Sequence, residues 1–334
     1  MAKNQESSKK SESPQKYDKK FLTGLLVDML NIRRFEEKAA QMYGLKKIGG
    51  FCHLYNGQEA VAVGSVAALD LKRDYILTSY RDHGHALAVG MSADSVMAEL
   101  FGKITGCSRG KGGSMHMFDA ERHMLGGNGI VGAQIPIATG VAFASKYKGT
   151  DGVTLCYFGD GAIHQGAFHE SLNLAAVWKL PAIYIVENNN FGMGTAVRRV
   201  SSVDDFSVKA AGYDIPGKVV NGMDVLSLYE DLKEVIADAR KNSRPWLLDV
   251  KTYRYKGHSM SDPAKYRTKE ELEKYKEQDP ILLLKARMLK DKQITEDEFK
   301  KLDDEAKKIA QASVDFAEKS EEPALETMYE DIYA

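Results

Sequence analysis

The triplet Gly159-Asp160-Gly161, followed after residues 162–187 by Asn188-Asn189, decides how this chain folds. An apolar run, Val153 to Phe158, precedes the triplet, and a second run, Ala182 to Val186, precedes the asparagine pair. The amphipathic stretch between the two, from Ala162 to about Lys179, has the length and residue spacing of a helix. The sequence therefore predicts a strand–helix–strand unit whose two strands are parallel neighbours.

Asp160 and Asn189 each follow one of these predicted strands. Loops after parallel strands open at the same edge of a sheet, so we expect the two side chains to meet about one strand spacing (~5 Å) apart. A carboxylate and an amide oxygen, helped by a backbone carbonyl, are ligands suited to Mg²⁺. They are too few to enclose a metal, so water and the phosphate oxygens of a ligand would fill the other positions. The pattern predicts a magnesium-dependent clamp for a diphosphate.

Two arginines stand in similar positions elsewhere in the chain. Arg81 follows a short strand predicted at residues 75–78, and Arg254 lies in the polar loop after a strand predicted at residues 246–252. A guanidinium at the carboxyl end of a strand can hold two phosphate oxygens at once. The alternatives are a surface ion pair between Arg81 and Asp82, and a solvated surface loop around Arg254.

The composition is that of a globular protein: of 334 residues, 43% are hydrophobic and 28% charged, and the formal net charge is −1. So small a charge gives no general attraction to nucleic acid or to an anionic membrane, and we expect neither as a partner. No apolar run approaches the roughly 18 residues of a membrane span. The three cysteines form no CxxC pair, which favours a reducing compartment without disulfides or structural zinc.

Residues 1–20 are rich in Lys and Ser and have almost nothing to bury, so we expect a disordered tail. The tail lacks Arg and contains acidic residues, unlike a transit peptide, which favours a bacterial-type cytoplasmic protein over one of the mitochondrial matrix. No linker interrupts residues 21–334, for which we predict a single α/β domain. We expect a doubly wound, mostly parallel sheet with helices on both faces. An N-terminal helix over residues 17–47 and a charged helical layer from Lys269 onward would extend it.

The flanks of the opening stretch make it more specific. The segments Gly159 to Ala162 and Glu187 to Thr195 (ENNNFGMGT) resemble the alpha subunits of the thiamine diphosphate-dependent 2-oxo acid dehydrogenases, and the pyruvate dehydrogenase type is the most similar. The resemblance covers nearly all of residues 21–334 through four motif clusters in the family's order. It implies the thiamine diphosphate-binding fold, decarboxylation of pyruvate, and reductive acetylation of a lipoyl group on the acyltransferase core of the complex.

The resemblance also implies active-site histidines, diphosphate ligands, backbone contacts to the aminopyrimidine ring of the cofactor, and magnesium ligands. The active-site histidines would be His53 and His258, and the diphosphate ligands Tyr80, Arg81 and Arg254, with Gly161 beside them. The backbone contacts to the ring would come from Gly129 and Val131, and the magnesium ligands would be Asp160, Asn189 and the carbonyl oxygen of Phe191. Ser259 matches a serine that mitochondrial relatives phosphorylate, but the loop is one residue shorter after Pro263 and the next serine of that pattern is missing. His164 has no role in this assignment.

Two alternatives to the pyruvate enzyme remain. One is the closely similar acetoin dehydrogenase alpha subunit. The other, from a different class, is a non-catalytic regulatory subunit that binds magnesium and phosphate. Such a degenerate subunit is expected to have lost some site residues, whereas all of the expected ones are present, which favours an enzyme.

The chain offers one sheet edge for the diphosphate, whereas thiamine enzymes use two domains to bind one cofactor. We therefore expect the other half of the site, including the glutamate that activates the cofactor, on a beta subunit. The resemblance implies an α₂β₂ assembly.

Overall fold

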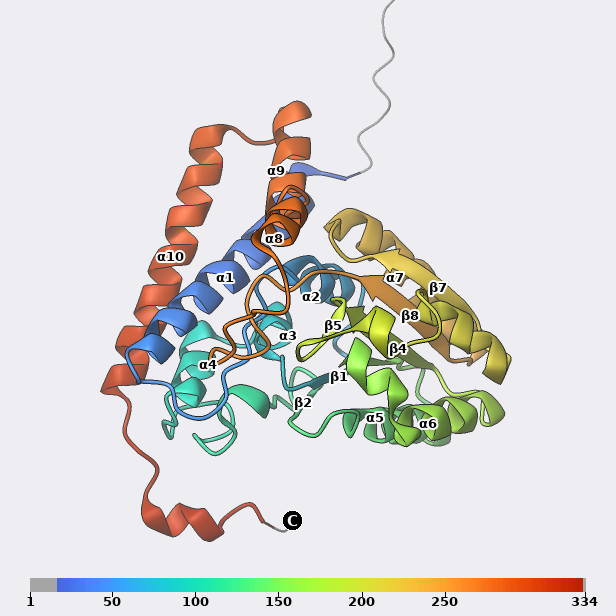
Figure 1. Cartoon of the computed structure of the whole chain (residues 1–334). Helices are drawn as coiled ribbons and strands as arrows, with labels where there is room; N and C mark the ends of the chain where they lie inside the picture. The colour runs from blue at the N-terminus through green and yellow to red at the C-terminus, as the bar shows by residue number, and fades with distance from the viewer. Residues whose placement is uncertain (1–16, 333–334) are drawn as a thin grey trace, which may run out of the picture.

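A six-stranded parallel sheet forms the centre of the computed structural model, which describes residues 17–332 (Figure 1). The strand order is β2-β1-β3-β4-β8-β7, and all neighbouring pairs are parallel. The strands are β1 (Tyr75–Ser79), β2 (Met124–Asn128), β3 (Thr154–Gly159), β4 (Ala182–Asn188), β7 (Gly217–Asn221) and β8 (Trp246–Lys251). The parallel α/β fold predicted from the sequence is confirmed.

Helices cover both faces of this sheet (Figure 1). Helices α5 (Gln134–Tyr147) and α6 (Gly166–Val177) pack on one face, and α2 (Glu59–Ala67) and α7 (Val225–Asn242) pack on the other. Side chains alternate between the two cores along β3, so that Cys156 faces α5 and α6 while Leu155 faces α2 and α7. Because both faces are buried, the central strands need apolar residues at successive positions, which explains their unbroken apolar runs.

The strand order places a topological switch point between β1 and β3. The chain leaves β1 for one edge of the sheet, through β2, and later proceeds from β3 toward the other edge, through β4. In open α/β sheets, ligands bind outside the carboxyl ends of the strands at such a point. The segments that follow β1, β3 and β4 carry Arg81, Asp160 and Asn189.

The first and last long helices, α1 (Lys19–Gly44) and α10 (Glu296–Lys319), pack side by side outside the sheet (Figure 1). Helices α8 (Lys269–Lys276) and α9 (Pro280–Lys290) precede α10, so the predicted C-terminal helical layer is confirmed. Helix α10 begins with a capping box in which Thr295 and Glu298 each accept a hydrogen bond from the backbone of the other.

The N-terminal boundary differs from the prediction. Of the predicted tail, residues 1–16 lie outside the described part of the chain. Helix α1 begins at Lys19, inside the range assigned to the tail, because the side chain of Asp18 caps it by accepting a hydrogen bond of 2.7 Å from the backbone of Phe21.

The helix after the Gly-Asp-Gly triplet also begins later than predicted. Residues Asp160–His164 form a short 3-10 turn, η2, and Gln165 is extended, with φ −75° and ψ 143°. Helix α6 therefore starts at Gly166 and not at Ala162. The turn keeps Asp160 at the strand end, next to the cavity described below.

The sequence pattern does not predict the two edge strands. Strand β2 contains the adjacent glycines Gly126 and Gly127, and β7 is short, with only Val220 fully buried. The other elements are α3 (His83–Ala88), α4 (Ala93–Leu100), the hairpin β5 (Phe191–Gly192) and β6 (Thr195–Ala196), and the 3-10 turns η1 (Gly113–Met115), η3 (Val197–Arg199), η4 (Phe206–Tyr213) and η5 (Leu325–Tyr329). None of the helices within residues 17–332 combines the length and the apolar character needed to cross a membrane.

Candidate active site

A cavity of about 190 Å³ opens at the carboxyl ends of β1, β3 and β4, at the switch point of the sheet. Residues from every strand-end loop of this region line it: Gln58, Ser79, Tyr80, Arg81, Val131, Gly132, Gln134, Gly159, Asp160, Gly161, Ala162, Glu187, Asn189, Phe191, Gly192, Met193 and Arg254. Eight of the predicted site residues are thus brought together: Tyr80, Arg81, Val131, Asp160, Gly161, Asn189, Phe191 and Arg254.

Asp160 and Asn189 line this cavity from neighbouring strands, as predicted, and both are buried. The amide nitrogen of Asn189 donates to Gln58 Oε1 at 3.0 Å, which directs Asn189 Oδ1 away from Gln58. Burial raises the pKa of the Asp160 carboxyl to about 6, although Arg254 and Arg81 oppose the shift. A nearby cation would restore the ionised carboxylate.

Arg81 is buried, and its guanidinium is fixed by two backbone carbonyls, Leu54 O at 2.6 Å and His258 O at 2.8 Å. Burial and the nearby Arg254 lower its pKa to about 10. The surface ion pair with Asp82 is ruled out, because Asp82 is itself buried and accepts a hydrogen bond from the backbone of Met117 at 3.0 Å.

Arg254 reaches the same cavity from the loop after β8. Its Nη2 donates to the hydroxyl of Tyr266 at 2.7 Å and to Met193 O at 3.3 Å. The side chain is buried, so the solvated loop considered from the sequence is ruled out at this position. Within residues 17–332, neither Arg254 nor Arg81 forms an ion pair with a carboxylate. Two buried guanidinium groups that share a cavity without a carboxylate partner favour an anionic ligand.

His53 and His258 lie together at one end of the cavity. His53 Nδ1 is 3.0 Å from the backbone oxygen of His258, and the centroids of the two rings are 5.0 Å apart. Neither imidazole lines the cavity itself; both contact Tyr80, which does, with centroid distances of 4.5 and 5.6 Å.

The environment of these histidines fixes the charge of both rings and the tautomer of His53. Burial, with the positive charge of Arg81, lowers the pKa of His53 to about 3 and that of His258 to about 4, so both are neutral near pH 7. A carbonyl oxygen can only accept, so Nδ1 of His53 carries the hydrogen and Nε2 keeps a free lone pair. His53 is therefore prepared to accept a proton at Nε2.

Comparison with known proteins gives this arrangement a family. Residues 27–326 match the family model described as "Dehydrogenase E1 component". The chain belongs to the dehydrogenase E1 component family. It is 55% identical over 306 residues to the pyruvate dehydrogenase E1 component subunit alpha of Rhizobium meliloti (strain 1021). The aligned residues cover 91% of this chain and 88% of that protein.

Further relatives agree. The protein of the same name from Rickettsia bellii (strain RML369-C) is 50% identical over 306 residues, with 92% of this chain and 94% of that protein covered. The chloroplastic subunit alpha-3 of Arabidopsis thaliana is 44% identical over 316 residues, with 93% and 74% covered. Enzymes of the dehydrogenase E1 component family depend on thiamine diphosphate.

Gly129, His164 and Ser259 lie outside the cavity, and of these only Gly129 was a predicted cofactor contact. Gly129 precedes the cavity wall formed by Val131 and Gly132 but does not line it. His164 is exposed and meets Phe206 edge-on at 6.4 Å, away from the cavity. Ser259 is buried, and its hydroxyl lies 2.9 Å from that of Ser261. No cluster of three or more His, Cys, Asp or Glu side chains suited to a metal occurs in the part of the chain that the structure describes.

Nine of the lining residues were not among the predicted site residues, and Glu187 and Gln58 are two of them. Glu187 is the penultimate residue of β4, accepts a hydrogen bond from the hydroxyl of Tyr55, and has its pKa raised by burial to about 7. Gln58 precedes α2, and its Nε2 is buried without a hydrogen-bond partner among residues 17–332. For Glu187, the available signal in the sequence was a glutamate that directly continues an apolar strand. No comparable signal marks Gln58.

Proposed function

We propose that this chain is the alpha subunit of a pyruvate dehydrogenase E1 component, and that the cavity at the strand ends holds the diphosphate of thiamine diphosphate with Mg²⁺. The observation that carries the proposal is the pair of buried arginines, Arg81 and Arg254, which face the same cavity as Asp160 and Asn189 without carboxylate partners. The names of the relatives support pyruvate as the substrate.

The residues present fit the cofactor. Asp160, Asn189 Oδ1 and the carbonyl oxygen of Phe191 supply oxygen ligands for Mg²⁺, and phosphate oxygens would complete its coordination. The two guanidinium groups and the metal outweigh the roughly three negative charges of the diphosphate. The unpaired Nε2 of Gln58 provides a further buried donor in the cavity wall. When bound, thiamine diphosphate supplies the carbon that adds to the 2-oxo acid and the ring that accepts the electrons released with CO₂.

The two histidines act on protons at the cavity's end. His53 Nε2, with its free lone pair, would accept the proton of the hydroxyl group that derives from the substrate's carbonyl oxygen, and would pass it to the lipoyl sulfur that is released as the S–S bond breaks and the other sulfur takes the acetyl group. His258 Nδ1 is buried without a hydrogen-bond partner in residues 17–332, so a substrate carboxylate or carbonyl can engage that ring. Because both rings are neutral, they do not compete with the arginines for the anion.

A beta subunit would complete the site. Val131 lines the cavity and is 42% exposed, its neighbour Ile130 is 76% exposed, and further exposed apolar side chains lie on α5, on α6 and directly after α6. These are Ile137, Phe143, Tyr147, Leu174, Val177 and Trp178. An apolar surface of this kind beside a site is typical of a subunit interface. The acetyl group would then pass to a lipoyl group of the acyltransferase core.

The test uses the chain co-purified with the beta subunit of the same organism. The pair is offered pyruvate, acetoin and branched-chain 2-oxo acids, with and without thiamine diphosphate and Mg²⁺, and reduction of an artificial electron acceptor is followed. We expect the highest kcat/KM for pyruvate and no turnover without cofactor. Preference for acetoin would reassign the substrate, and equal rates without cofactor would overturn the proposal.

A further inference from the structure

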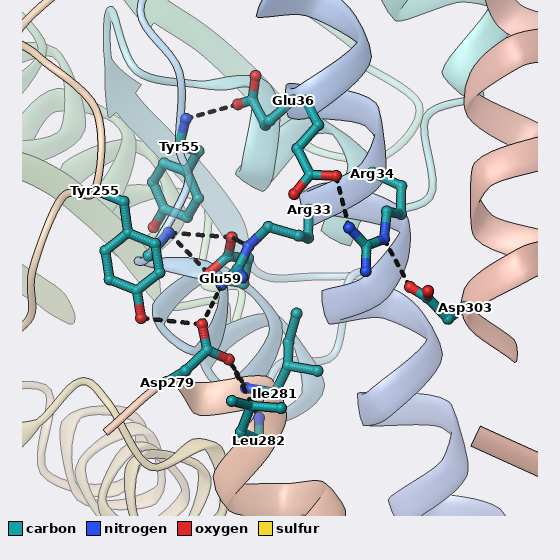
Figure 2. Close-up of polar contacts among 12 residues, drawn as sticks. Arg33, Arg34, Glu36, Tyr55, Glu59, Tyr255, Asp279, Ile281, Leu282 and Asp303 are labelled. Carbon is teal, nitrogen blue, oxygen red and sulfur yellow. Dashed lines mark hydrogen bonds and ion pairs between the residues drawn. The ribbon is translucent and has the colours of Figure 1, made fainter. Parts of the chain in front are cut away.

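Helix α1 carries two charged side chains that lie outside the proposed cofactor site: Glu36, which is buried, and Arg33, which is 14% exposed. They are three residues apart and therefore lie on one face of the helix. Each leads, through named contacts, to one of the two loops that carry the active-site residues. Figure 2 shows both side chains pointing from α1 toward these loops, whereas Arg34 points toward Asp303.

Arg33 leads to the loop after β8. Its guanidinium pairs with Glu59 at 2.5 Å and with Asp279 at 2.8 Å (Figure 2). Asp279 accepts a hydrogen bond of 3.0 Å from the hydroxyl of Tyr255, and Arg33 lies 5.2 Å from the centroid of the Tyr255 ring. Tyr255 directly follows Arg254, whose side chain lines the cavity. The Arg33 cluster thus fixes the residue next to the proposed phosphate ligand.

Glu36 leads to the segment that carries His53. Its carboxylate accepts a hydrogen bond of 2.7 Å from the backbone of Tyr55 and lies 3.0 Å from His83 Nδ1. His83 Nε2 is 2.8 Å from Ser114 Oγ, which accepts a hydrogen bond of 3.1 Å from the backbone of His53. Burial opposes protonation of His83, but Glu36 and Asp82 raise its pKa above the ordinary value. Glu36 and His83 are thus a buried, hydrogen-bonded carboxylate–imidazole pair that is linked to His53 through Ser114.

The two loops are also joined to each other. The backbone of Tyr255 donates to Asn56 O at 2.9 Å, and the backbone of Met260 donates to Cys52 O at 2.9 Å. The segments 52–56 and 255–260 are therefore one paired unit, held from the same helix at two points. Gly57, which follows, donates to both oxygens of Glu59, the partner of Arg33.

We propose that Arg33 and Glu36 are positioning residues: Arg33, through Asp279 and Tyr255, sets the place of Arg254, and Glu36, through His83 and Ser114, sets the place of His53. This rests on the function proposed above. Arg33 accordingly governs binding of the diphosphate, and Glu36 governs turnover. A bond that only stabilised the fold would affect both quantities alike or neither.

The test compares Arg33→Gln, Glu36→Gln and the control Arg34→Gln in the alpha–beta complex. Arg34 is the next residue on the same helix and also forms an ion pair, at 2.6 Å with Asp303, but that pair faces α10. Binding of thiamine diphosphate is measured by calorimetry, turnover by steady-state kinetics, and backbone order by hydrogen exchange of residues 52–57 and 253–260. Tyr255→Phe and Ser114→Ala remove single hydroxyl groups and serve if the larger changes prevent folding.

We expect Arg33→Gln to weaken cofactor binding about tenfold or more and to speed exchange in residues 253–260. Glu36→Gln should lower kcat by up to about 10²-fold and speed exchange in residues 52–57. It should weaken cofactor binding as well, because Leu54 O holds Arg81, but by less than it lowers kcat and by less than Arg33→Gln does. Arg34→Gln should change none of these. Tyr255→Phe and Ser114→Ala should repeat the two patterns more weakly.

The proposal is overturned if Arg33→Gln and Arg34→Gln have the same effects, or if Glu36→Gln changes binding and turnover in equal proportion. Failure of the proposed function looks different. In that case the unchanged complex itself would neither bind thiamine diphosphate nor turn over a 2-oxo acid, while the exchange measurements would still report whether α1 orders the two loops.

Discussion

Arg81 and Arg254 are prepared for an anion in different ways. Arg81 donates to two backbone carbonyls, so its orientation is fixed before any ligand arrives. Arg254 donates to the hydroxyl of Tyr266 and to two backbone carbonyls, Lys256 O at 3.1 Å and Met193 O at 3.3 Å, of which the second contact is long. A planar fork that is already in place loses little conformational freedom when it binds a phosphate.

Replacing Arg254 with Lys tests the importance of this fork. The charge remains, but the paired donors are lost, so we expect the affinity for thiamine diphosphate to fall about tenfold, the worth of one charge-assisted hydrogen bond. Calorimetric titration of the complex measures it. Arg244→Lys is the matched control, because Arg244 is exposed and pairs with Asp238. Equal affinities for the two variants would contradict the proposed role.

The burial of His85 can be tested through the pH dependence of the free energy of unfolding. His85 is fully buried, its Nε2 lies 3.5 Å from Glu187 Oε1, and burial lowers its pKa to about 3. Between pH 6.5 and 3 the unfolded chain binds a proton at this residue and the folded chain does not, so stability falls as the pH falls through that window. The slope is at most about 1.4 kcal/mol per pH unit.

The measurement compares denaturant unfolding of the unchanged chain and His85→Gln between pH 7 and pH 4.5. We expect the free energy of unfolding of the unchanged chain to fall more steeply on acidification. Glu187, whose pKa burial raises to about 7, titrates with the opposite sign, since its folded form keeps a proton that the unfolded form loses as the pH rises. Because Glu187 Oε1 lies 3.5 Å from His85 Nε2, the same pair is also compared in a Glu187→Gln background, where the difference isolates His85. Parallel pH curves would contradict the assignment.

At the level of elements, the sequence predicts what is buried on both sides. The runs at residues 153–158 and 182–186 became β3 and β4 because a strand covered on both faces requires successive apolar residues. Strand β7 is an edge strand with partly exposed residues, so its sequence lacks that signal. The 3-10 turn at Asp160–His164 was not predicted, because its residues also suit an α-helix. Only the extended Gln165 separates this turn from helix α6.

The positions of the residues that line the cavity were predicted to the same extent and for the same reason. Side chains that follow a buried strand, such as Asp160, Asn189 and Arg81, could be placed at one sheet edge from the sequence alone. Gln58 could not, because its place depends on how α2 packs against the sheet. Nor could Arg33 and Glu36, whose contacts join α1 to residues far away in the sequence.

The capping box of α10 gives a prediction for an element. Thr295→Ala removes the side-chain oxygen that accepts a hydrogen bond from the backbone of Glu298 at 3.1 Å. We expect the free energy of unfolding to fall by about 1 kcal/mol. Denaturant unfolding measures the loss, and Thr295→Ser, which keeps the hydroxyl, is the control. The interpretation fails if the serine variant is destabilised as much as the alanine variant.

At the level of the whole molecule, the chain presents half of a site. Its cavity ends at the exposed Ile130 and Val131, and apolar side chains continue from there over α5 and α6. We expect the purified chain alone to decarboxylate pyruvate at a negligible rate, and the rate to appear when the beta subunit is added. Robust turnover by the chain alone would contradict the divided site.

The central claim is that the strand-end cavity holds thiamine diphosphate through Mg²⁺ at Asp160. The most direct measurement is calorimetric titration of thiamine diphosphate into the alpha–beta complex with and without Mg²⁺, for the unchanged chain, Asp160→Ala and the exposed control Asp315→Ala. We predict saturable, Mg²⁺-dependent binding by the unchanged chain and by the control, and loss of that Mg²⁺ dependence in Asp160→Ala. Binding that is indifferent to Mg²⁺ in the unchanged chain, or unaltered in Asp160→Ala, would contradict the claim.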